Sequence, residues 1–300
     1  MDEASLSSHG HKQLKHLSQS HDLRETVQVY EKGSSGRKDL VYSGEQQDSV
    51  EREEIVVTLQ GFILRCNLSP ITRNDQLSKN PVAAKQSLVL TGLGNDDFET
   101  AARAVLEIHT LFASTLPDNA LLPWKPIRDE DFVCIEFSNR FFETGGDSES
   151  RIVQLSADID PMGFLRAHCP TGRHTEDNVV LYYERHINPN SGEKTYLACK
   201  PVCVRVGQLV EIQASFCTVP ITKGRHTMLS KLRVVCILGN PVQEDLNNEI
   251  FKVVKESPRS PTKKTKRNVG YESQQGSQEE TNTTAALKRL RLEDTSMDQH

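Results

Sequence analysis

The chain has 300 residues, of which 36% are hydrophobic, and its 36 basic and 41 acidic residues give a formal net charge of −5. This slightly acidic balance argues against a protein that coats nucleic acid along its whole length. The hydrophobic share is below the roughly 45–50% of typical globular domains, and large apolar side chains are scarce at both ends. We therefore expect one folded region between two polar ends.

No segment has the pattern of a secretion signal or of a membrane span. The N-terminal residues are polar and lack an apolar run behind a basic start. No run approaches the roughly 18 apolar residues of a spanning helix. The seven cysteines form no C-x-x-C pair, and several lie in apolar, strand-like runs. This usage predicts free thiols in a reducing compartment, either the nucleus or the cytoplasm.

The first 52 residues carry only weak structural signals. Residues 1–24 are rich in Ser, His and Gln, which predicts a disordered polar arm. ETVQVY (25–30) and DLVYS (39–43) read as short strands around the turn-like sequence KGSSGR. Residues 25–52 are therefore expected to hold an outlying hairpin.

Residues 53–240 are predicted to form the folded domain. Apolar, β-branched runs predict strands over 53–69 and 85–94. The clearest helix lies at about 96–116, where apolar residues recur every three or four positions. The Pro-containing stretch 117–131 is a candidate sub-boundary.

Strand patterns dominate from residue 132 onward. A strand beginning at Phe132 and a second one, RIVQLSADID, precede an irregular segment, and two hairpins follow, each with a Gly-containing turn. After the strand that begins at Phe132, the predicted strands are 151–160, 179–187, 193–200, 207–219 and 225–239.

The final hairpin alternates between apolar and polar residues, which predicts an antiparallel sheet with one buried face and one wet face. Glu211, Lys231 and Arg233 fall on the wet face, where we expect them to pair across the strands. The residues predicted to face the core are Val210, Ile212, Ala214 and Phe216 on one strand and Met228, Leu232, Val234, Cys236 and Leu238 on the other.

The predicted fold class is therefore α+β or mainly β. It comprises an antiparallel sheet domain with one prominent helix and disordered N- and C-terminal tails. The C-terminal tail, 241–300, is expected to be basic and largely disordered.

No cofactor is predicted, but two residue sets are candidates for metal binding. Asp158 and Asp160 follow an apolar run, and paired carboxylates at a strand end suit Mg²⁺ or Mn²⁺; the alternative is a turn helped by Pro161. Mixed Cys and His ligands suit Zn²⁺. Their spacing matches no zinc finger, and the alternative is that the cysteines pack as free thiols. The candidates of this kind are Cys169, His174, Cys199 and Cys203.

The tail carries the strongest local signal. Between Lys252 and Arg267 seven residues are basic and one is acidic. Such a run predicts a nuclear-import signal or a nucleic-acid patch, and the alternative is merely solvated charge. The basic residues singled out are Lys263, Lys264, Lys266 and Arg267, with a second cluster at Lys288, Arg289 and Arg291.

Two serines in the tail precede proline, as in substrates of proline-directed kinases. They are Ser257 and Ser260. Each phosphate would add about −1.5 to −2 charges and offset much of the basic patch. Phosphorylation is therefore predicted to change the tail from basic to nearly neutral. Phosphorylation-site mapping that finds both serines always unmodified would contradict this.

Residues 179–239, from VVLYYERHI through VEIQASFCTVPITKGRHTMLSKLRVVCIL, resemble a segment that recurs in uncharacterised proteins of mushroom-forming (basidiomycete) fungi. The shared features are a G-[DQ]-[LI]-V-E-[VI]-Q strand, a hairpin with basic residues and a second strand ending in L-R and apolar residues. These features belong to a fold and not to a catalytic site. The resemblance implies a fungal, soluble protein and no mechanism.

The sequence thus predicts a non-enzymatic binding or scaffold protein of the nucleus. Its partners would be the import machinery and either a protein or a nucleic acid contacted by the tail, with no membrane. One alternative is a metal-dependent phosphoryl- or glycosyl-transfer enzyme that uses Asp158 and Asp160. Another is a cytoplasmic protein-interaction domain with a merely solvated tail.

Overall fold

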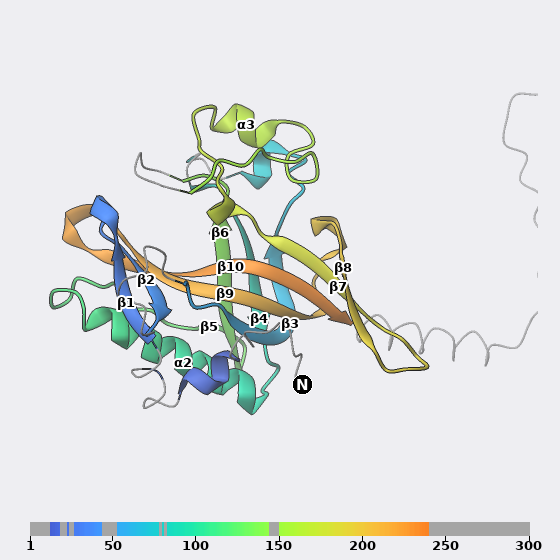
Figure 1. Ribbon diagram of the computed structural model, residues 1–300, viewed down its shortest axis with the longest axis horizontal. Coiled ribbons are helices and arrows are strands. Elements are labelled where there is room, and N and C mark those ends of the chain that lie inside the picture. Colours follow the sequence, from blue (N-terminus) through green and yellow to red (C-terminus); the bar gives the residue numbers. More distant parts are fainter. Residues whose placement is uncertain are drawn as a thin grey trace, which may run out of the picture. The chain divides into compact units, whose positions relative to one another are not determined.

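Ten strands and a long helix make up most of the computed structural model, which describes residues 13–18, 23, 27–43, 53–77, 80, 83–143 and 150–239 (Figure 1). The helices are α2 (Asp96–Ala113) and the short α3 (Phe164–His168). In chain order the strands are β1 (Val27–Lys32), β2 (Arg37–Tyr42), β3 (Val57–Asn67), β4 (Lys85–Thr91), β5 (Ile127–Asp129), β6 (Phe132–Arg140), β7 (Leu181–Ile187), β8 (Lys194–Ala198), β9 (Leu209–Pro220) and β10 (His226–Gly239).

Five strands close into a barrel. Antiparallel pairing joins β9 to β3, β3 to β4 and β4 to β6, while β10 pairs with β6 in parallel and with β9 in antiparallel fashion. The two edges of β3 pair with different strands, β9 over Val57–Phe62 and β4 over Phe62–Asn67. A closed barrel leaves its own strands without edges, which removes sites of unwanted strand pairing.

Two hairpins extend the barrel on opposite sides (Figure 1). β1 and β2 form the first, which joins β9 through Lys38 and Asp39. β7 and β8 form the second, which joins β10 in parallel register over Leu181–Glu184. The hairpin expected over 25–52 is thus present, but its attachment to β9 makes it part of the sheet and not an outlying element. The expected antiparallel sheet is a mixed one.

α2 packs below the barrel (Figure 1) and is amphipathic, as its spacing predicts. Its buried face includes Phe98, Val105, Ile108 and Phe112. Asn95 caps the helix, since its side chain accepts hydrogen bonds from the backbone N–H groups of residues 97 and 98. The helix lies so close to β3 that a Cβ at Gly61 would be 3.0 Å from the Phe98 ring. A side chain at this position would therefore press against both the helix and the neighbouring strand β4, where the Thr91 carbonyl oxygen would be 3.1 Å away.

The folded part of the chain begins earlier than the sequence predicts. The short 3₁₀ helix η1 (Leu14–Ser18) lies against α2, and Leu14 and Leu17 are fully buried in the main core. Burial of each leucine contributes about 1.5–3 kcal/mol. The prediction of a disordered arm over 1–24 is therefore wrong for this segment, because the two leucines complete the core beneath the helix.

The strand expected at 151–160 is absent. Ile152 forms only an isolated bridge with Thr175, and its side chain is exposed. Nearby, a second small core lies beneath α3. It consists of Ile71, Ala84, Phe141, Phe142, Leu165 and Cys169.

The final hairpin departs from strict alternation at a β-bulge. The register of β10 against β9 shifts between Leu232 and Val234, which leaves Arg233 as the extra residue. On β9 the four predicted core residues are confirmed. On β10 the main core cluster includes Met228, Leu232, Val235 and Ile237. Cys236 and Leu238 are buried as predicted, but they lie outside this cluster, and the assignment of Val234 to the core is wrong. The bulge is the physical reason. One extra residue in the strand turns every later side chain to the face opposite the one that strict alternation predicts.

No helix in the described ranges has the length and apolarity that crossing a membrane requires.

Candidate functional site

The polar face of the β9–β10 pair is covered, in contrast to the predicted wet face. Glu211, Ser215 and Lys231 are 4%, 0% and 8% exposed. At one end of this face a carboxylate, Asp177, gathers three cations. At the other end Glu211 lines a small pocket.

Asp177 lies in the loop before β7 and is the centre of an ion-pair cluster. Its carboxylate is 3.4 Å from Arg37 Nη1, 3.4 Å from Arg233 Nη1 and 4.0 Å from Lys231 Nζ. Arg233 Nη2 also donates to Glu54 Oε1 at 2.8 Å. The cluster therefore joins β2, β10 and the segments before β3 and β7 around one face of the barrel.

The electrostatics of the cluster follow from burial and opposite charge. Burial alone would raise the pKa of Asp177, but Lys231, Arg233 and Arg37 outweigh it and lower that pKa to about 2. Burial lowers the pKa of Lys231, with a further contribution from its neighbours Arg233 and Arg37. The predicted pairing of Lys231 and Arg233 with Glu211 is wrong, because Asp177 and Glu54 take these cations. Every charged group here has a partner of opposite sign, so the cluster serves to hold segments together.

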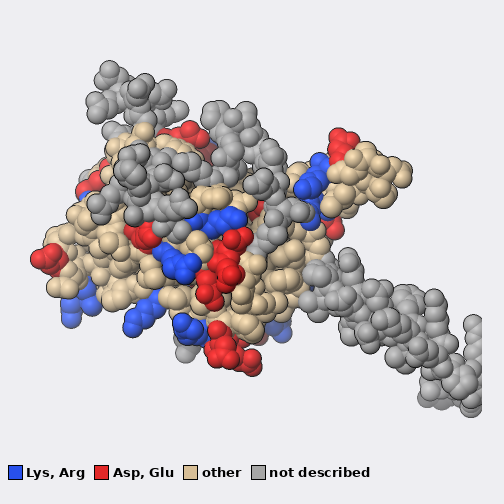
Figure 2. Space-filling model, turned by 90° about the horizontal axis from the view of Figure 1, so that it is seen from below, with Lys and Arg blue, Asp and Glu red and all other residues tan. Residues whose placement is uncertain are grey.

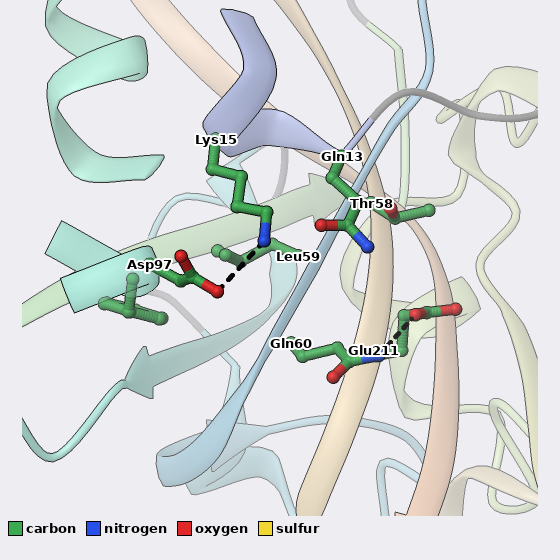
Figure 3. Close-up of a pocket in the computed structure, with 8 residues that line it drawn as sticks. Gln13, Lys15, Thr58, Leu59, Gln60, Asp97 and Glu211 are labelled. Atoms are coloured by element: carbon green, nitrogen blue, oxygen red, sulfur yellow. Dashed lines mark hydrogen bonds and ion pairs between the residues drawn. The ribbon is translucent and has the colours of Figure 1, made fainter. Parts of the chain in front are cut away.

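The pocket lies between η1, the start of α2 and strands β3 and β9 (Figure 3). On its floor Gln60 Nε2 donates to Glu211 Oε2 at 2.8 Å. At its rim Lys15 Nζ is 3.0 Å from Asp97 Oδ2 (Figure 3). Gln13, Thr58, Leu59 and Phe98 complete the lining. The lining offers hydrogen bonds and an ion pair, and none of its described residues is a Cys, His or Ser.

The β7–β8 hairpin is the most exposed apolar element. Ten large hydrophobic side chains are exposed among the described residues, and five of the ten lie between residues 181 and 206. Leu181 and Ile187 share one face of β7, and Leu197 lies on β8. The five are Leu181, Ile187, Leu197, Val202 and Val206. β8 is also the last strand of the sheet, so its outer edge pairs with no described strand.

The two aspartates proposed for Mg²⁺ or Mn²⁺ have separate structural partners. Asp158 Oδ1 accepts a hydrogen bond from Lys200 Nζ at 2.8 Å. Asp160 accepts from the backbone N–H groups of Leu165 and Arg166 at 3.1 and 3.0 Å, at the start of α3. Each carboxylate thus fixes a different neighbouring segment.

The four residues proposed for Zn²⁺ fall into two separate environments. Cys169 and His174 are buried near the second core, where His174 Nδ1 donates to the Phe141 carbonyl oxygen at 2.7 Å. Burial lowers the pKa of this histidine, which favours its neutral form. Cys199 and Cys203 instead follow β8, where Cys199 is half-buried and Cys203 is exposed. Among the described residues no three His, Cys, Asp or Glu side chains are grouped as metal ligands would be.

The basic and phosphorylation sites of the tail lie outside the described residues, as does everything after Gly239. On the face of the molecule in Figure 2, Lys and Arg are interspersed with Asp and Glu. The visible part of this face therefore shows no broad region of a single sign that would attract a polyanion.

Sequence reasoning missed Arg37, Glu54 and Asp177 as members of one cluster. The three lie on segments far apart in the chain, and no spacing signal links them. No protein-family model and no curated protein matches this chain.

Proposed function

We propose that the chain is a non-enzymatic binding protein of the nucleus. In this proposal the barrel is a rigid support, the β7–β8 hairpin binds a partner protein, and the basic tail directs nuclear import. The observation that carries the proposal is the concentration of exposed apolar side chains on and beside one hairpin. Exposed apolar side chains beside an unpaired sheet edge are typical of sites at which a partner strand adds.

The geometry of the hairpin favours an extended segment of the partner as the bound element. β8 ends the sheet, and a peptide that adds to its outer edge would bond through main-chain groups. Apolar side chains then supply specificity on both faces of the new strand. Ile187 and Leu197 lie on opposite faces of the hairpin, about half exposed, at 49% and 56%.

The charges on the hairpin favour a protein over a nucleic acid as the partner of the folded domain. Glu184 and Glu193 alternate with Arg185 and Lys194 along the two strands. Nucleic-acid binding needs a surplus of positive charge to neutralise phosphates. The balanced hairpin lacks that surplus, so any contact with nucleic acid is assigned to the tail.

Site-specific photo-crosslinking in cells tests the proposed surface. The full chain would carry a photo-reactive amino acid in place of Leu197. A matched chain would carry it in place of Leu93, which is similarly exposed (53%) and lies in the turn before α2. We expect a discrete crosslinked protein from position 197 only. Its purified form should bind the wild-type chain and lose binding to Leu197→Asp.

Three outcomes of that experiment would count against the proposal. Equal crosslinking from both positions would indicate no selective surface. Crosslinks only between copies of this chain would replace the partner by self-association. Unchanged binding by Leu197→Asp would move the site away from the hairpin.

Imaging of fluorescent fusions tests the proposed nuclear localisation. The full chain should be nuclear, and replacement of Lys263, Lys264, Lys266 and Arg267 by Ala should make it cytoplasmic. Replacement of Lys263, Lys264 and Lys266 by Arg, and of Arg267 by Lys, is the matched control, which keeps the positive charge and should leave the protein nuclear. Cytoplasmic wild-type protein would contradict the nuclear assignment.

Salt titration separates the two partner classes. If nucleic acid binds through the tail, deletion of residues 257–300 should abolish weak binding and its steep salt dependence. Retention of nucleic-acid binding by the truncated chain would contradict a protein as the partner of the folded domain.

A further inference from the structure

The backbone of β8 presents every second residue to the open edge of the sheet. The Cys199 N–H donates to the Tyr182 carbonyl oxygen, and the Glu193 carbonyl oxygen accepts from the other side of the hairpin turn, both at 2.9 Å. Antiparallel partners exchange both bonds at every second residue. The odd-numbered residues of β8 therefore turn their N–H and C=O groups towards β7. Tyr196 and Ala198 turn theirs outward, where no described strand pairs with β8.

The charged side chains of the hairpin are sorted by sign onto its two faces. Side chains alternate between the faces along each strand, and the register places Glu184 directly opposite Leu197. Glu193 shares the face of these two residues, whereas Arg185 and Lys194 lie on the other face. The hairpin is balanced as a whole, but each face presents its acidic or its basic groups alone.

We propose that the partner segment is a strand that pairs antiparallel with β8 and carries an apolar residue opposite Leu197, an acidic residue opposite Lys194 and a basic residue opposite Glu193. Read from its N-terminus, the segment has first the apolar residue, then the acidic residue and directly after it the basic one. This inference rests on the proposed function, because it names the chemistry of the segment that the hairpin binds.

Each part of this pattern matches one feature of the edge. Leu197 takes a non-hydrogen-bonded position relative to an added strand, and Cα atoms at such positions are only about 4.5 Å apart. An apolar residue there covers a side chain that is 56% exposed. Opposite charges directly across two strands are stabilising and like charges are destabilising. A segment with its acidic and basic residues exchanged is therefore disfavoured on both faces.

A displayed library of random peptides supplies the probe. Peptides would be selected on the immobilised full chain, and those that also bind Leu197→Asp would be discarded. We expect the remaining peptides to share the apolar, acidic and basic pattern. Exchange of the acidic and basic residues in a selected peptide should weaken its binding by about tenfold.

Charge reversal on the chain identifies the pairing. Glu193 is exposed, so Glu193→Lys should fold as the wild type does and should bind a selected peptide more weakly. A peptide whose basic residue is changed to Glu should regain binding to this variant. Asp118→Lys, an equal charge change at an exposed site, is the matched control and should leave binding unchanged. The chain two residues later bonds to His226 at the start of β10, whereas β7 pairs with the end of that strand.

Backbone methylation tests the strand pairing itself. N-methylation of the peptide residues opposite Tyr196 and Ala198 should weaken binding by about tenfold each, because their N–H groups bond to the edge. N-methylation of the apolar residue should have little effect, because its N–H points away from β8. In the full chain, hydrogen exchange at the Tyr196 and Ala198 amides should slow when the peptide binds. The Cys199 amide, already bonded to β7, should exchange slowly in both states.

The outcomes separate this inference from the proposed function. If no selected peptide depends on Leu197, both are overturned. If peptides depend on Leu197 but methylation shows no alternation, or if Glu193→Lys leaves binding unchanged, the hairpin binds its partner in another form and this inference alone is overturned. Selected peptides with the pattern in reverse order would indicate a parallel strand and would overturn it as well.

Discussion

The two hairpins that flank the barrel have similar construction and opposite surroundings. β1–β2 and β7–β8 are both antiparallel and both join a barrel strand through one of their own strands. Leu40 and Val41 on β2 are buried, whereas Leu181, Ile187 and Leu197 on the other hairpin are about half exposed. A hairpin added to a sheet is thus free to serve either the core or the surface.

Ion pairs account for part of this difference. Arg37 on β2 contacts Asp39 at 2.8 Å and Asp177 at 3.4 Å, which ties the first hairpin to the loop before β7. The printed ion pair of the second hairpin, Glu184 with His186, lies on side chains that are about half exposed. Exposed pairs contribute little to stability. We therefore expect the first hairpin to contribute to the free energy of unfolding and the second to be available to a partner.

The largest expected effect comes from removing the anion at the centre of the cluster. Asp177→Ala would leave Arg37, Lys231 and Arg233 close together without their shared carboxylate. We expect the free energy of unfolding to fall by about 4 kcal/mol, as when one member of a buried ion pair is lost. Urea denaturation measures this. Asp158→Ala, which breaks an exposed pair with Lys200, should cost less than about 0.5 kcal/mol, and similar costs for both variants would refute the structural role of the cluster.

Apolar truncations compare the two hairpins directly. Leu40 is fully buried, so Leu40→Ala should lower the free energy of unfolding by about 3 kcal/mol. Leu197→Ala on the exposed hairpin should change it by no more than about 0.5 kcal/mol. A large loss from Leu197→Ala would show that the second hairpin also supports the fold.

Acid titration isolates the charge of Asp177. Its pKa in the folded chain, about 2, is below the unfolded value of 3.8. The stabilisation is therefore complete above about pH 4 and is lost as the pH falls towards 2, for a total of about 2 kcal/mol. Asp177→Asn should remove this part of the pH dependence, while the exposed-site control Asp158→Asn should keep it. Unfolding curves at fixed pH values from 5 to 2 provide the measurement, and equal slopes in the wild type and Asp177→Asn would contradict the assignment.

The smallest expected effect on stability belongs to the surface that we assign to binding. Leu197→Ser should alter the free energy of unfolding by no more than about 0.5 kcal/mol, yet it should weaken binding of the crosslinked partner. Surface-immobilised wild-type and variant chains would show this as a faster dissociation rate. Equal dissociation rates would separate the exposed apolar side chains from the proposed function.

Local patterns predicted the elements that local physics determines. The periodicity of α2, the β-branched runs of β3 and β4, and the alternation of β9 are all visible in short windows. The bulge at Arg233 is not visible in this way. The sequence K-L-R-V-V gives no sign of an extra residue, so it does not reveal which of the later side chains face the core. The parallel pairing of β10 with β6 and β7 also depends on long-range contacts, which no window reports.

The candidate sites show the same division. The residues Cys169, His174, Cys199 and Cys203 were singled out as one zinc-binding set from their types alone, but the first two are buried near the second core and the other two follow β8. Asp177 was not singled out, because its partners Arg37 and Arg233 are distant in sequence and meet only through the fold. Leu14 and Leu17 were passed over for a related reason: they lie in a polar segment, and only the surface of α2 makes them core residues.

The closed barrel also constrains the order in which the chain assembles during synthesis. β3, β4 and β6 form a continuous sheet as soon as residue 140 is available, but both ends of that sheet stay open until β9 and β10 emerge. The partners Val57 and Ala214 are far apart in sequence, and such non-local contacts fold slowly. A nascent chain with three barrel strands therefore exposes two unpaired edges and an uncovered interior, which is the stage at which chaperones would bind and at which aggregation would compete with folding.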